Sequence, residues 1–399
     1  MTNPPPASTS DWSLQPTMDW LFTRGRMISD NNRFTHELAT RLVKSGAPID
    51  GLRIMVRTLN PQVLAYSDFW SSSDNATHTA TARHGVRSTD RYIGSPLQAL
   101  LEEHRTLHQP LGDLPENPHA AYAELISHGH TDYLGIPIEL SDGAFSAIIF
   151  TTKKPSGFDA ADVERLHRLR DYLAPVLELH SIRHTAISVM NTYVGQGTGR
   201  KILNGMIQRG DADLINAALW FSDLRNFTHL TETLPARQLL DMLNDYFEFV
   251  SAAVSARGGE ILRFIGDAML IVFPIDDNTS HQAACNAAVD AAIDACDTLA
   301  ALNHRRQRQA QPPIEFGVGL NVGEVIYGNV GAPDRLDFTV MGPAVNRTAR
   351  LESLTKSLHT NILFSEEFAN LIDAPAQDLG DHAMKGIDGL QKVFGLAEV

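Results

Sequence analysis

Two short apolar runs, each ending at an aspartate, constrain the fold of this chain more than any other feature. Residues 217–221 form a buried-strand run, and Asp223 follows two positions later. Two further apolar runs, 260–265 and 268–273, are separated only by Gly-Asp, a hairpin signal that places Asp267 at the tip. Strand ends and hairpin tips belong to a rigid sheet, so we expect the two carboxylates to lie side by side.

An aspartate at a turn is usually a turn former or a helix cap. A pair held together suggests a different role, because paired carboxylates and substrate phosphates supply the oxygen ligands with which proteins hold Mg²⁺. Two such metal ions can activate a nucleophilic oxygen and neutralise phosphate charge. The pattern therefore predicts a metal-dependent reaction at a phosphate group.

Composition limits the alternatives. A length of 399 residues is typical of two or three domains. The net charge of −14 argues against a nucleic-acid partner. No apolar run reaches the roughly 18 residues that a membrane span needs, and the N-terminus lacks a basic-then-apolar signal pattern. We expect a protein of the cytoplasm without a membrane span.

The order of local signals predicts four segments. Residues 1–30 contain a Pro- and Ser-rich start and are predicted to be disordered or extended. Residues 31–180 alternate hairpin signals with helical spacing and are predicted to form a sensor domain of α/β class. Residues 181–212 combine a helical pattern with a Gly-rich stretch, which favours either a flexible linker or a signal relay. Residues 213–399 form the last domain.

Within the sensor segment, residues 133–177 carry a hairpin, a Pro-Ser-Gly-Phe-Asp helix start and a helix that leaves the domain. This order resembles a GAF-type sensor domain, although a PAS-like or degenerate dimerisation domain would show much the same pattern. The apolar stripe of the exit helix continues to Leu177, Leu179 and Ile182. It predicts a parallel helix pair between two chains, with an ordinary core-facing helix as the rival interpretation. The signal is an unknown small molecule or protein.

Two patterns in the last domain carry further predictions. Glycines at 319, 323, 328 and 331 predict a strand that ends near residue 320, followed by a tight hairpin with close backbone approach. A helix is predicted from Pro343, an allowed first residue, so that Asn346 and Arg350 project from one face. An amide and a guanidinium together offer fixed donors to phosphate or ribose oxygens.

Residues from about 213 to 399 resemble the catalytic domain of class III nucleotidyl cyclases. Five elements carry the resemblance in order: FSDLRNFT (221–228), GGEILRFIGDAMLIVF (258–273), GLNVGEVIYGNVG (319–331), DFTVMGPAVNRTARLE (337–352) and MKGIDGLQKVFGL (384–396). The resemblance implies an α+β, ferredoxin-like fold that acts as a homodimer with sites at the subunit interface. It also implies conversion of a nucleoside triphosphate into a 3′,5′-cyclic monophosphate and pyrophosphate.

The resemblance assigns roles to single residues. Asp223 and Asp267 match the ligands of two Mg²⁺ or Mn²⁺ ions per site, and the carbonyl of Leu224 is a further candidate ligand. Asn346 matches the residue that orients the ribose, and Arg350 matches the one that stabilises charge at the α-phosphate.

Lysine and arginine side chains complete the implied substrate site. Lys385 matches a phosphate-binding lysine, and Arg335 is a weaker candidate for the same role. The two positions that select the base are Arg263 and Thr339, where adenylyl cyclases usually have Lys and either Asp or Thr. Arginine departs from that pattern because its forked guanidinium replaces a point donor.

The functional prediction is a sensor-regulated adenylate cyclase that uses ATP. Arg263 is donor-only and suits adenine N1, while the Thr339 hydroxyl can accept a hydrogen bond from the exocyclic amine. A guanylate cyclase and a non-catalytic nucleotide-binding regulator remain the alternatives. A diguanylate cyclase is disfavoured, because the hairpin tip reads Phe-Ile-Gly-Asp-Ala instead of a GGDEF-like turn.

Overall fold

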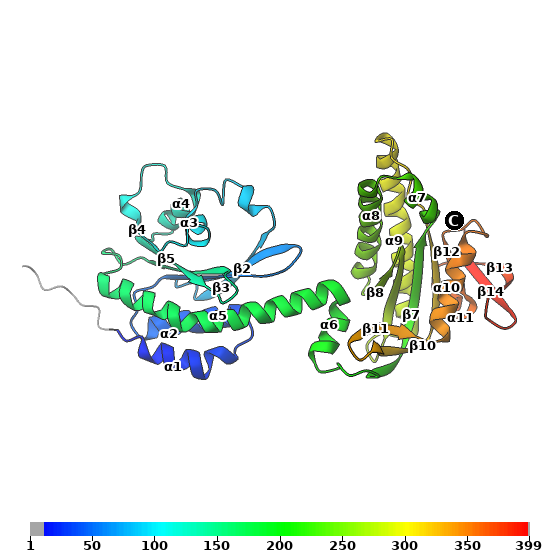
Figure 1. The fold of residues 1–399 in the computed structure, drawn as a ribbon, viewed down its shortest axis with the longest axis horizontal. Helices are drawn as coiled ribbons and strands as arrows, with labels where there is room; N and C mark the ends of the chain where they lie inside the picture. Colours follow the sequence, from blue (N-terminus) through cyan, green and yellow to red (C-terminus); the bar gives the residue numbers. More distant parts are fainter. Residues whose placement is uncertain (1–11, 398–399) are drawn as a thin grey trace, which may run out of the picture. The chain divides into compact units, whose positions relative to one another are not determined.

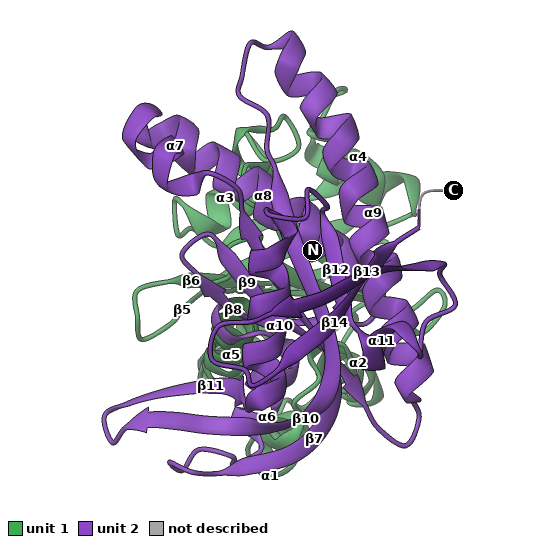
Figure 2. Cartoon of the chain, turned by 90° about the vertical axis from the view of Figure 1, so that its right-hand side faces the viewer, with its two compact units in different colours: residues 1–192 green, residues 193–399 purple. Residues whose placement is uncertain are grey.

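A computed structural model describes residues 12–397, and the chain divides into two compact units, residues 1–192 and 193–399 (Figure 2). Each unit has its own hydrophobic core. Within the described range, the helices are all too short or too polar to cross a membrane.

The first unit is built on a six-stranded antiparallel sheet with the order β3-β2-β1-β6-β5-β4 (Figure 1). Its strands are β1 (Gly51–Arg57), β2 (Val63–Ser71), β3 (Ala76–Arg83), β4 (Leu107–Pro110), β5 (Asp132–Glu139) and β6 (Phe145–Thr152). Its helices are α1 (Gln15–Thr23), α2 (Asn31–Lys44), α3 (Pro96–Leu101), α4 (Ala120–Ser127) and α5 (Ala160–Val194), with short 3-10 turns at Gly25–Met27, Val86–Ser88 and Leu111–Asp113.

The sheet of the first unit is covered on both faces. Helices α1, α2 and α5 share a core with the inward-facing residues of the central strands, such as Ile148 and Phe150. Residues of α3 and α4 pack with Tyr133 and Ile149 on the other face. The alternation of these side chains along β6 explains why one strand serves two cores.

The sequence prediction for residues 1–30 is wrong over Gln15–Thr23, which is helical. Trp20 and Leu21 are buried there, and the Trp20 ring stacks on Phe34 of α2 with centroids 5.7 Å apart. This tertiary packing stabilises the helix. The sequence around it is polar and contains Pro, so it carries no local helical signal. Residues 1–11 of the same prediction lie outside the described residues.

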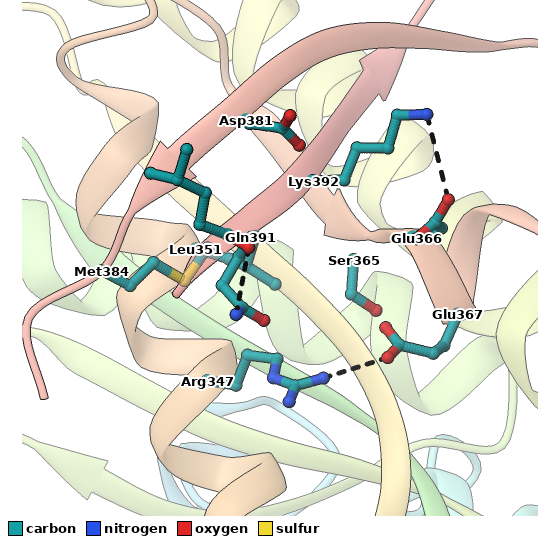
Figure 3. Close-up of a pocket in the computed structure, with 10 residues that line it drawn as sticks. Arg347, Leu351, Ser365, Glu366, Glu367, Asp381, Met384, Gln391 and Lys392 are labelled. Atoms are coloured by element: carbon teal, nitrogen blue, oxygen red, sulfur yellow. Dashed lines mark hydrogen bonds and ion pairs between the residues drawn. The ribbon is translucent and has the colours of Figure 1, made fainter. Parts of the chain in front are cut away.

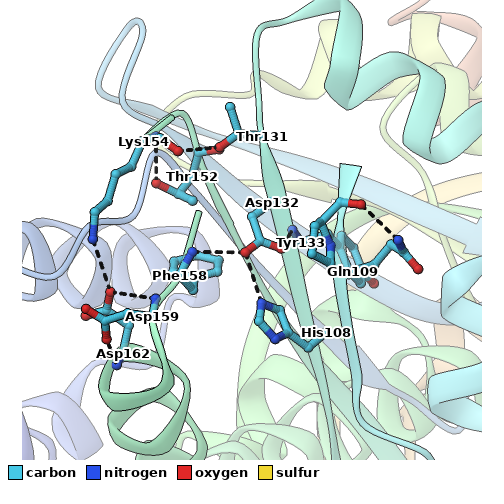
Figure 4. A network of polar contacts seen from close by, with 11 residues as sticks. His108, Gln109, Thr131, Asp132, Tyr133, Thr152, Lys154, Phe158, Asp159 and Asp162 are labelled. Atoms are coloured by element: carbon cyan, nitrogen blue, oxygen red, sulfur yellow. Dashed lines mark hydrogen bonds and ion pairs between the residues drawn. The ribbon is translucent and has the colours of Figure 1, made fainter. Parts of the chain in front are cut away.

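A buried polar network fixes the start of α5 against the sheet (Figure 4). The Asp132 carboxylate accepts a hydrogen bond from the Phe158 amide at 2.9 Å and lies 2.9 Å from Nε2 of His108. Asp162, also buried, accepts a hydrogen bond from Nε1 of Trp12 at 2.8 Å. Because these carboxylates are shielded from water, the network defines where α5 leaves the sheet.

The second unit contains an eight-stranded sheet with the path β13-β14-β12-β10-β7-β9-β8, and β11 pairs with β10 outside this path. Its strands are β7 (Ala212–Leu224), β8 (Glu260–Ile265), β9 (Ala268–Ile275), β10 (Phe316–Ala332), β11 (Arg335–Met341), β12 (Ile362–Ser365), β13 (Ala376–Ala383) and β14 (Leu390–Leu396). Its helices are α6 (Gln196–Leu203), α7 (Phe227–Thr233), α8 (Ala236–Ala256), α9 (His281–Arg308), α10 (Pro343–Thr355) and α11 (Glu366–Ala369).

The core of the second unit follows the chain order β7-α8-β8-β9-α9-β10, with the antiparallel strand order β10-β7-β9-β8. This is the split β-α-β arrangement of a ferredoxin-like fold, as the sequence predicted. Helices α8 and α9 pack on one face around Trp220, whereas Leu219 points to the opposite face. Asp223 lies four residues after Leu219 in the same strand, so its side chain is on the same face as Leu219, opposite to α8 and α9.

The hairpin predicted within residues 321–331 is wrong, because β10 continues unbroken from Phe316 to Ala332 and turns only before β11. The glycines serve close packing instead. A Cβ atom on Gly319 would lie 2.3 Å from the Thr348 carbonyl oxygen of α10, and one on Gly328 would lie 2.3 Å from the Asp211 carbonyl oxygen. The predicted close approach of the backbone is therefore present, whereas the predicted turn is absent from residues 321–331.

Candidate active site

Asp223 and Asp267 come together at one edge of the second sheet. Asp223 is the penultimate residue of β7, and Asp267 lies in the two-residue turn between β8 and β9. The register that pairs Ser222 with Met269 brings the end of β7 next to this turn. Both carboxylates are partly buried. The predicted hairpin tip and strand end are both present.

The electrostatics of this pair are unfavourable without a cation. The pKa of Asp223 is raised from 3.8 to about 7, mainly because burial disfavours the charged form and then because of hydrogen bonding and repulsion from Asp267. The Leu224 amide opposes this shift by donating to Oδ1 of Asp223 at 3.1 Å. A divalent cation between the carboxylates would remove the repulsion.

Glu352 on α10 is a third acidic residue of this region, and the sequence analysis gave it no role. Burial and then the charge of Asp223 raise its pKa to about 7, while Arg225 opposes the shift. Gly317 is the register partner of Asp223, and a Cβ atom on Gly317 would lie 2.8 Å from Oε1 of Glu352. The available signal was a carboxylate on the sheet-facing side of α10, between the buried Thr348 and Thr355.

The two predicted base-selecting residues lie on neighbouring elements. Arg263 of β8 forms an ion pair with Asp337 of β11, and Thr339 follows Asp337 on the same side of that strand. Thr339 is buried, whereas Arg263 is exposed. The structure therefore adds Asp337 to this region, a carboxylate that the sequence analysis did not single out.

The remaining predicted residues are exposed and separate from the Asp pair. Asn346 and Arg350 lie on one exposed face of α10, Lys385 precedes β14, and Arg335 begins β11. Within residues 12–397, these four side chains form no hydrogen bond or ion pair with Asp223 or Asp267. Among the described residues, the two groups of predicted site residues are thus not joined by a hydrogen bond or an ion pair.

A pocket of the described residues lies elsewhere in the second unit (Figure 3). It has a volume of about 240 Å³ and lies between α10, α11 and the β13–β14 strands. Its charges are paired internally: Arg347 with Glu367 at 3.1 Å and Lys392 with Glu366 at 3.9 Å. None of the predicted site residues lines it, so we assign no substrate to this pocket.

The Asp pair suits a divalent metal ion in donor chemistry but is incomplete as a cage. Hard carboxylate oxygens are the ligands that Mg²⁺ and Mn²⁺ prefer. Among the residues the structure describes, no group of three or more His, Cys, Asp or Glu side chains is arranged to hold a metal ion. A metal ion held there would need further oxygen ligands from a bound phosphate and from water.

The repulsion at the pair gives a stability prediction. A carboxyl group whose pKa is raised by folding costs stability above its unfolded pKa of 3.8, and the cost is complete above about 7. We expect Asp267→Asn to raise the metal-free stability at pH 8 by about 1 kcal/mol, discounted for partial exposure, and to have a smaller effect at pH 5. Thermal unfolding at both pH values measures this difference.

Mn²⁺ provides the second half of that test. Mn²⁺ should raise the melting temperature of the wild type but not of Asp267→Asn, because an ion that binds only the folded state stabilises that state. The exposed Asp277→Asn, at the other end of β9, serves as the matched control and should behave like the wild type. Equal Mn²⁺ stabilisation of wild type and Asp267→Asn would contradict a metal site at this pair.

Comparisons with known proteins identify the second unit. Residues 212–397 match the family model described as the adenylate and guanylate cyclase catalytic domain. An adenylate cyclase of Anabaena cylindrica is 33% identical over 196 residues, which cover 48% of this chain and 37% of that protein. The terminal-differentiation-specific adenylate cyclase of Dictyostelium discoideum is 36% identical over 157 residues, which cover 39% of this chain and 7% of that protein.

Similar solved structures include the adenylyl cyclase CyaB of P. aeruginosa, which is 30% identical to this chain. The match covers 47% of this chain and 96% of that chain, with a TM-score of 0.44. The guanylyl cyclase Cya2 follows with 29% identity, coverage of 47% and 95%, and a TM-score of 0.41. The chain spans well under half the length of the curated relatives it matches. Residues 212–397 are therefore a catalytic domain of the adenylate and guanylate cyclase family.

Proposed function

We propose that this protein is an adenylate cyclase that converts ATP into 3′,5′-cyclic AMP and pyrophosphate. The observation that carries the proposal is the convergence of Asp223 and Asp267 at one sheet edge, where burial and mutual repulsion create a place for cations. Bound there, two Mg²⁺ or Mn²⁺ ions would supply the positive charge that activates the ribose 3′ oxygen and neutralises the phosphates. The Leu224 carbonyl is a further candidate ligand.

The cationic and amide side chains have complementary roles. Asn346 orients the ribose through its fixed amide donor and acceptor. Arg350, one helical turn further along α10, stabilises negative charge that develops at the α-phosphate. Lys385 and, with less support, Arg335 bind phosphate oxygens. A non-catalytic regulator is disfavoured because the set of metal, ribose and phosphate residues is intact.

ATP is favoured over GTP by the hydrogen-bonding capacity of Arg263 and Thr339. Arg263 can only donate, which suits adenine N1, and the Thr339 hydroxyl can accept from the exocyclic amine. Guanine presents N1–H and an amino group, so it needs an acceptor. Asp337 is such an acceptor, but its ion pair with Arg263 occupies it. Guanylate cyclase activity is the second candidate because this carboxylate lies so close to the base-selecting residues.

The lack of hydrogen bonds and ion pairs between the two residue groups, within residues 12–397, supports a shared site. Asp223 and Asp267 of one chain would face the Arg263, Thr339, Asn346, Arg350 and Lys385 side chains of a second chain. An isologous dimer of this kind contains two equivalent sites, related by its two-fold axis. The exposure of Asn346 and Arg350 in the single chain is consistent with partners that come from another copy.

Mixing two inactive variants tests the shared site. Asp267→Ala and Arg350→Ala should each abolish cyclic AMP formation. In a mixed dimer, one site collects both substitutions and the other collects none, so activity should return to about half of the wild-type rate per mixed dimer. Heterodimer formation is measured in parallel by two affinity tags. An inactive mixture that contains heterodimers would exclude a site shared in this way.

We further propose that the first unit is a GAF-like sensor that acts through α5. The six-stranded antiparallel sheet with helices on both faces supports a sensor-type domain. One side of α5 is bound by the β1–β2 turn: Ser181 Oγ donates to the Arg57 carbonyl at 3.1 Å, and Asn60 hydrogen-bonds to Ser188. A change in this sheet would therefore be transmitted directly to the helix.

The other side of α5 carries an exposed apolar stripe. Leu179, Ile182, Val189 and Tyr193 follow heptad spacing with Ala186 between them, and their exposed fractions are 50%, 60%, 37% and 79%. Such a stripe fits a parallel pairing with the same helix of a second chain. Of the three residues that the sequence indicated, Leu177 is buried in the core of the first unit, as the rival interpretation expects, whereas Leu179 and Ile182 belong to the exposed stripe. The exposed part of the stripe favours the dimer interpretation.

Charge at the stripe tests the pairing. Ile182→Glu places two carboxylates at the helix interface, so it should weaken dimerisation of the full chain by on the order of tenfold. Sedimentation equilibrium measures the dimer Kd, and the cyclase rate at low protein concentration should fall with it. The control is Ile93→Glu, a similarly exposed isoleucine in the first unit (54% against 60%). Equal Kd values for both variants would contradict this role of α5.

A further inference from the structure

The first turn of α6 lies directly against the start of β8 (Figure 1). Gly195 precedes the helix with φ of +88°, and a Cβ atom there would lie 3.2 Å from the Ile261 carbonyl oxygen. A Cβ atom on Gly197 would lie 2.3 Å from Oε2 of Glu260. The glycines of this stretch therefore do more than make it flexible, because they allow the helix to touch Glu260, the first residue of β8.

Glu260 is held by a compact set of hydrogen bonds. Its Oε1 accepts from the Thr198 amide at 2.8 Å and from the Thr198 hydroxyl at 3.4 Å, and its Oε2 accepts from the Tyr327 hydroxyl at 3.3 Å. The two hydroxyls are 3.0 Å apart. Thr198 and Tyr327 are 1% and 3% exposed, so water does not compete for these bonds. A carboxylate at the start of a helix is also favoured by the helix dipole.

The bonds of Glu260 lie next to a β-bulge. Glu260 pairs with Val272 and Ile261 with Ile271, but the next pair is Arg263 with Leu270, so Leu262 has no partner of its own. Leu262 is buried in a cluster to which Ile202 of α6 also belongs. A bulge bends its strand and changes the direction of the side chains that follow. Here the side chain that follows is Arg263, which pairs with Asp337.

We propose that Glu260 is a positioning residue: held by the first turn of α6 and by Tyr327, it fixes the β8 bulge and so keeps Arg263 paired with Asp337 in the orientation that selects adenine. The proposal rests on the proposed function and deepens it, because it assigns nucleotide selectivity to residues that do not touch the base. It also makes α6, the helix that follows α5 in the chain, a control point for substrate recognition.

The direction of the effect follows from the Arg263–Asp337 ion pair. When the bulge loosens, Arg263 loses its fixed orientation toward adenine N1. At the same time, Asp337 becomes available as an acceptor for the N1–H and amino group of guanine. Both changes lower the preference for ATP. A purely structural role of Glu260 would instead reduce the amount of active enzyme and leave the preference unchanged.

The experiment measures kcat/KM for ATP and for GTP with the full-length protein and Mn²⁺. Glu260→Ala and Thr198→Val should each lower the ATP/GTP ratio by roughly tenfold, the scale expected of a misplaced specificity group. Glu260→Gln keeps an acceptor for the Thr198 amide and should retain most of the ratio. Arg200→Ala, an exposed position on the same helix, is the matched control and should retain all of it.

A fall in rate with an unchanged ratio for Glu260→Ala and Thr198→Val would overturn the proposal. If Glu260→Ala does not fold, Tyr327→Phe carries the test, because it removes one hydrogen bond and little volume. Amide hydrogen exchange supplies a readout without turnover: residues 261–265 should exchange faster in Glu260→Ala than in Arg200→Ala, and equal rates would also overturn the proposal. Wild-type protein that cyclises neither nucleotide would refute the proposed function, and hydrogen exchange would still judge the role of Glu260.

Discussion

The repulsion between Asp223 and Asp267 is the constraint on which the organisation of the catalytic unit depends. Two carboxylates stay together in a partly buried place only if rigid elements hold both. Here a strand end and a two-residue turn do so, and the paired strands β7 and β9 fix their separation. Burial, and after it the neighbouring Asp267, raises the pKa of Asp223, which reflects the energetic cost of this arrangement. A divalent metal ion with its bound triphosphate would relieve the repulsion between the two carboxylates.

The rest of the unit follows from that constraint. Helix α10 crosses β10 at Gly317 and Gly319, where side chains on the strand would collide with Glu352 and the helix backbone. On α10, Asn346 and Arg350 lie on an exposed face, and within residues 12–397 they form no hydrogen bond or ion pair with the Asp pair of their own chain. The proposed metal ligands and the proposed phosphate-binding donors of one chain are therefore two separate groups of side chains. The proposed homodimer would bring the two groups together, and the contact of α6 with β8 would give α6 a route to Arg263, the proposed base-selecting residue.

Sequence reasoning predicted the strand–turn positions of Asp223 and Asp267, because apolar runs and a Gly-Asp turn are local signals. It also predicted the helix from Pro343 with Asn346 and Arg350 on one face. It missed helix α1, whose stability comes from packing of Trp20 on Phe34, and it replaced the long β10 by a hairpin. Glu352, Asp337 and Glu260 were missed for the same reason. Their significance depends on which residues from distant segments lie beside them, and no local pattern contains that information.

A product assay on the purified 399-residue chain tests the cyclase assignment most directly. ATP and GTP are supplied separately with Mg²⁺ or Mn²⁺, and nucleotide products and pyrophosphate are quantified together. We expect metal-dependent formation of 3′,5′-cyclic AMP and pyrophosphate in equal amounts, with a higher kcat/KM for ATP than for GTP. Higher kcat/KM for GTP would contradict the assignment of the base site. Release of inorganic phosphate without a cyclic product would contradict the cyclase mechanism itself.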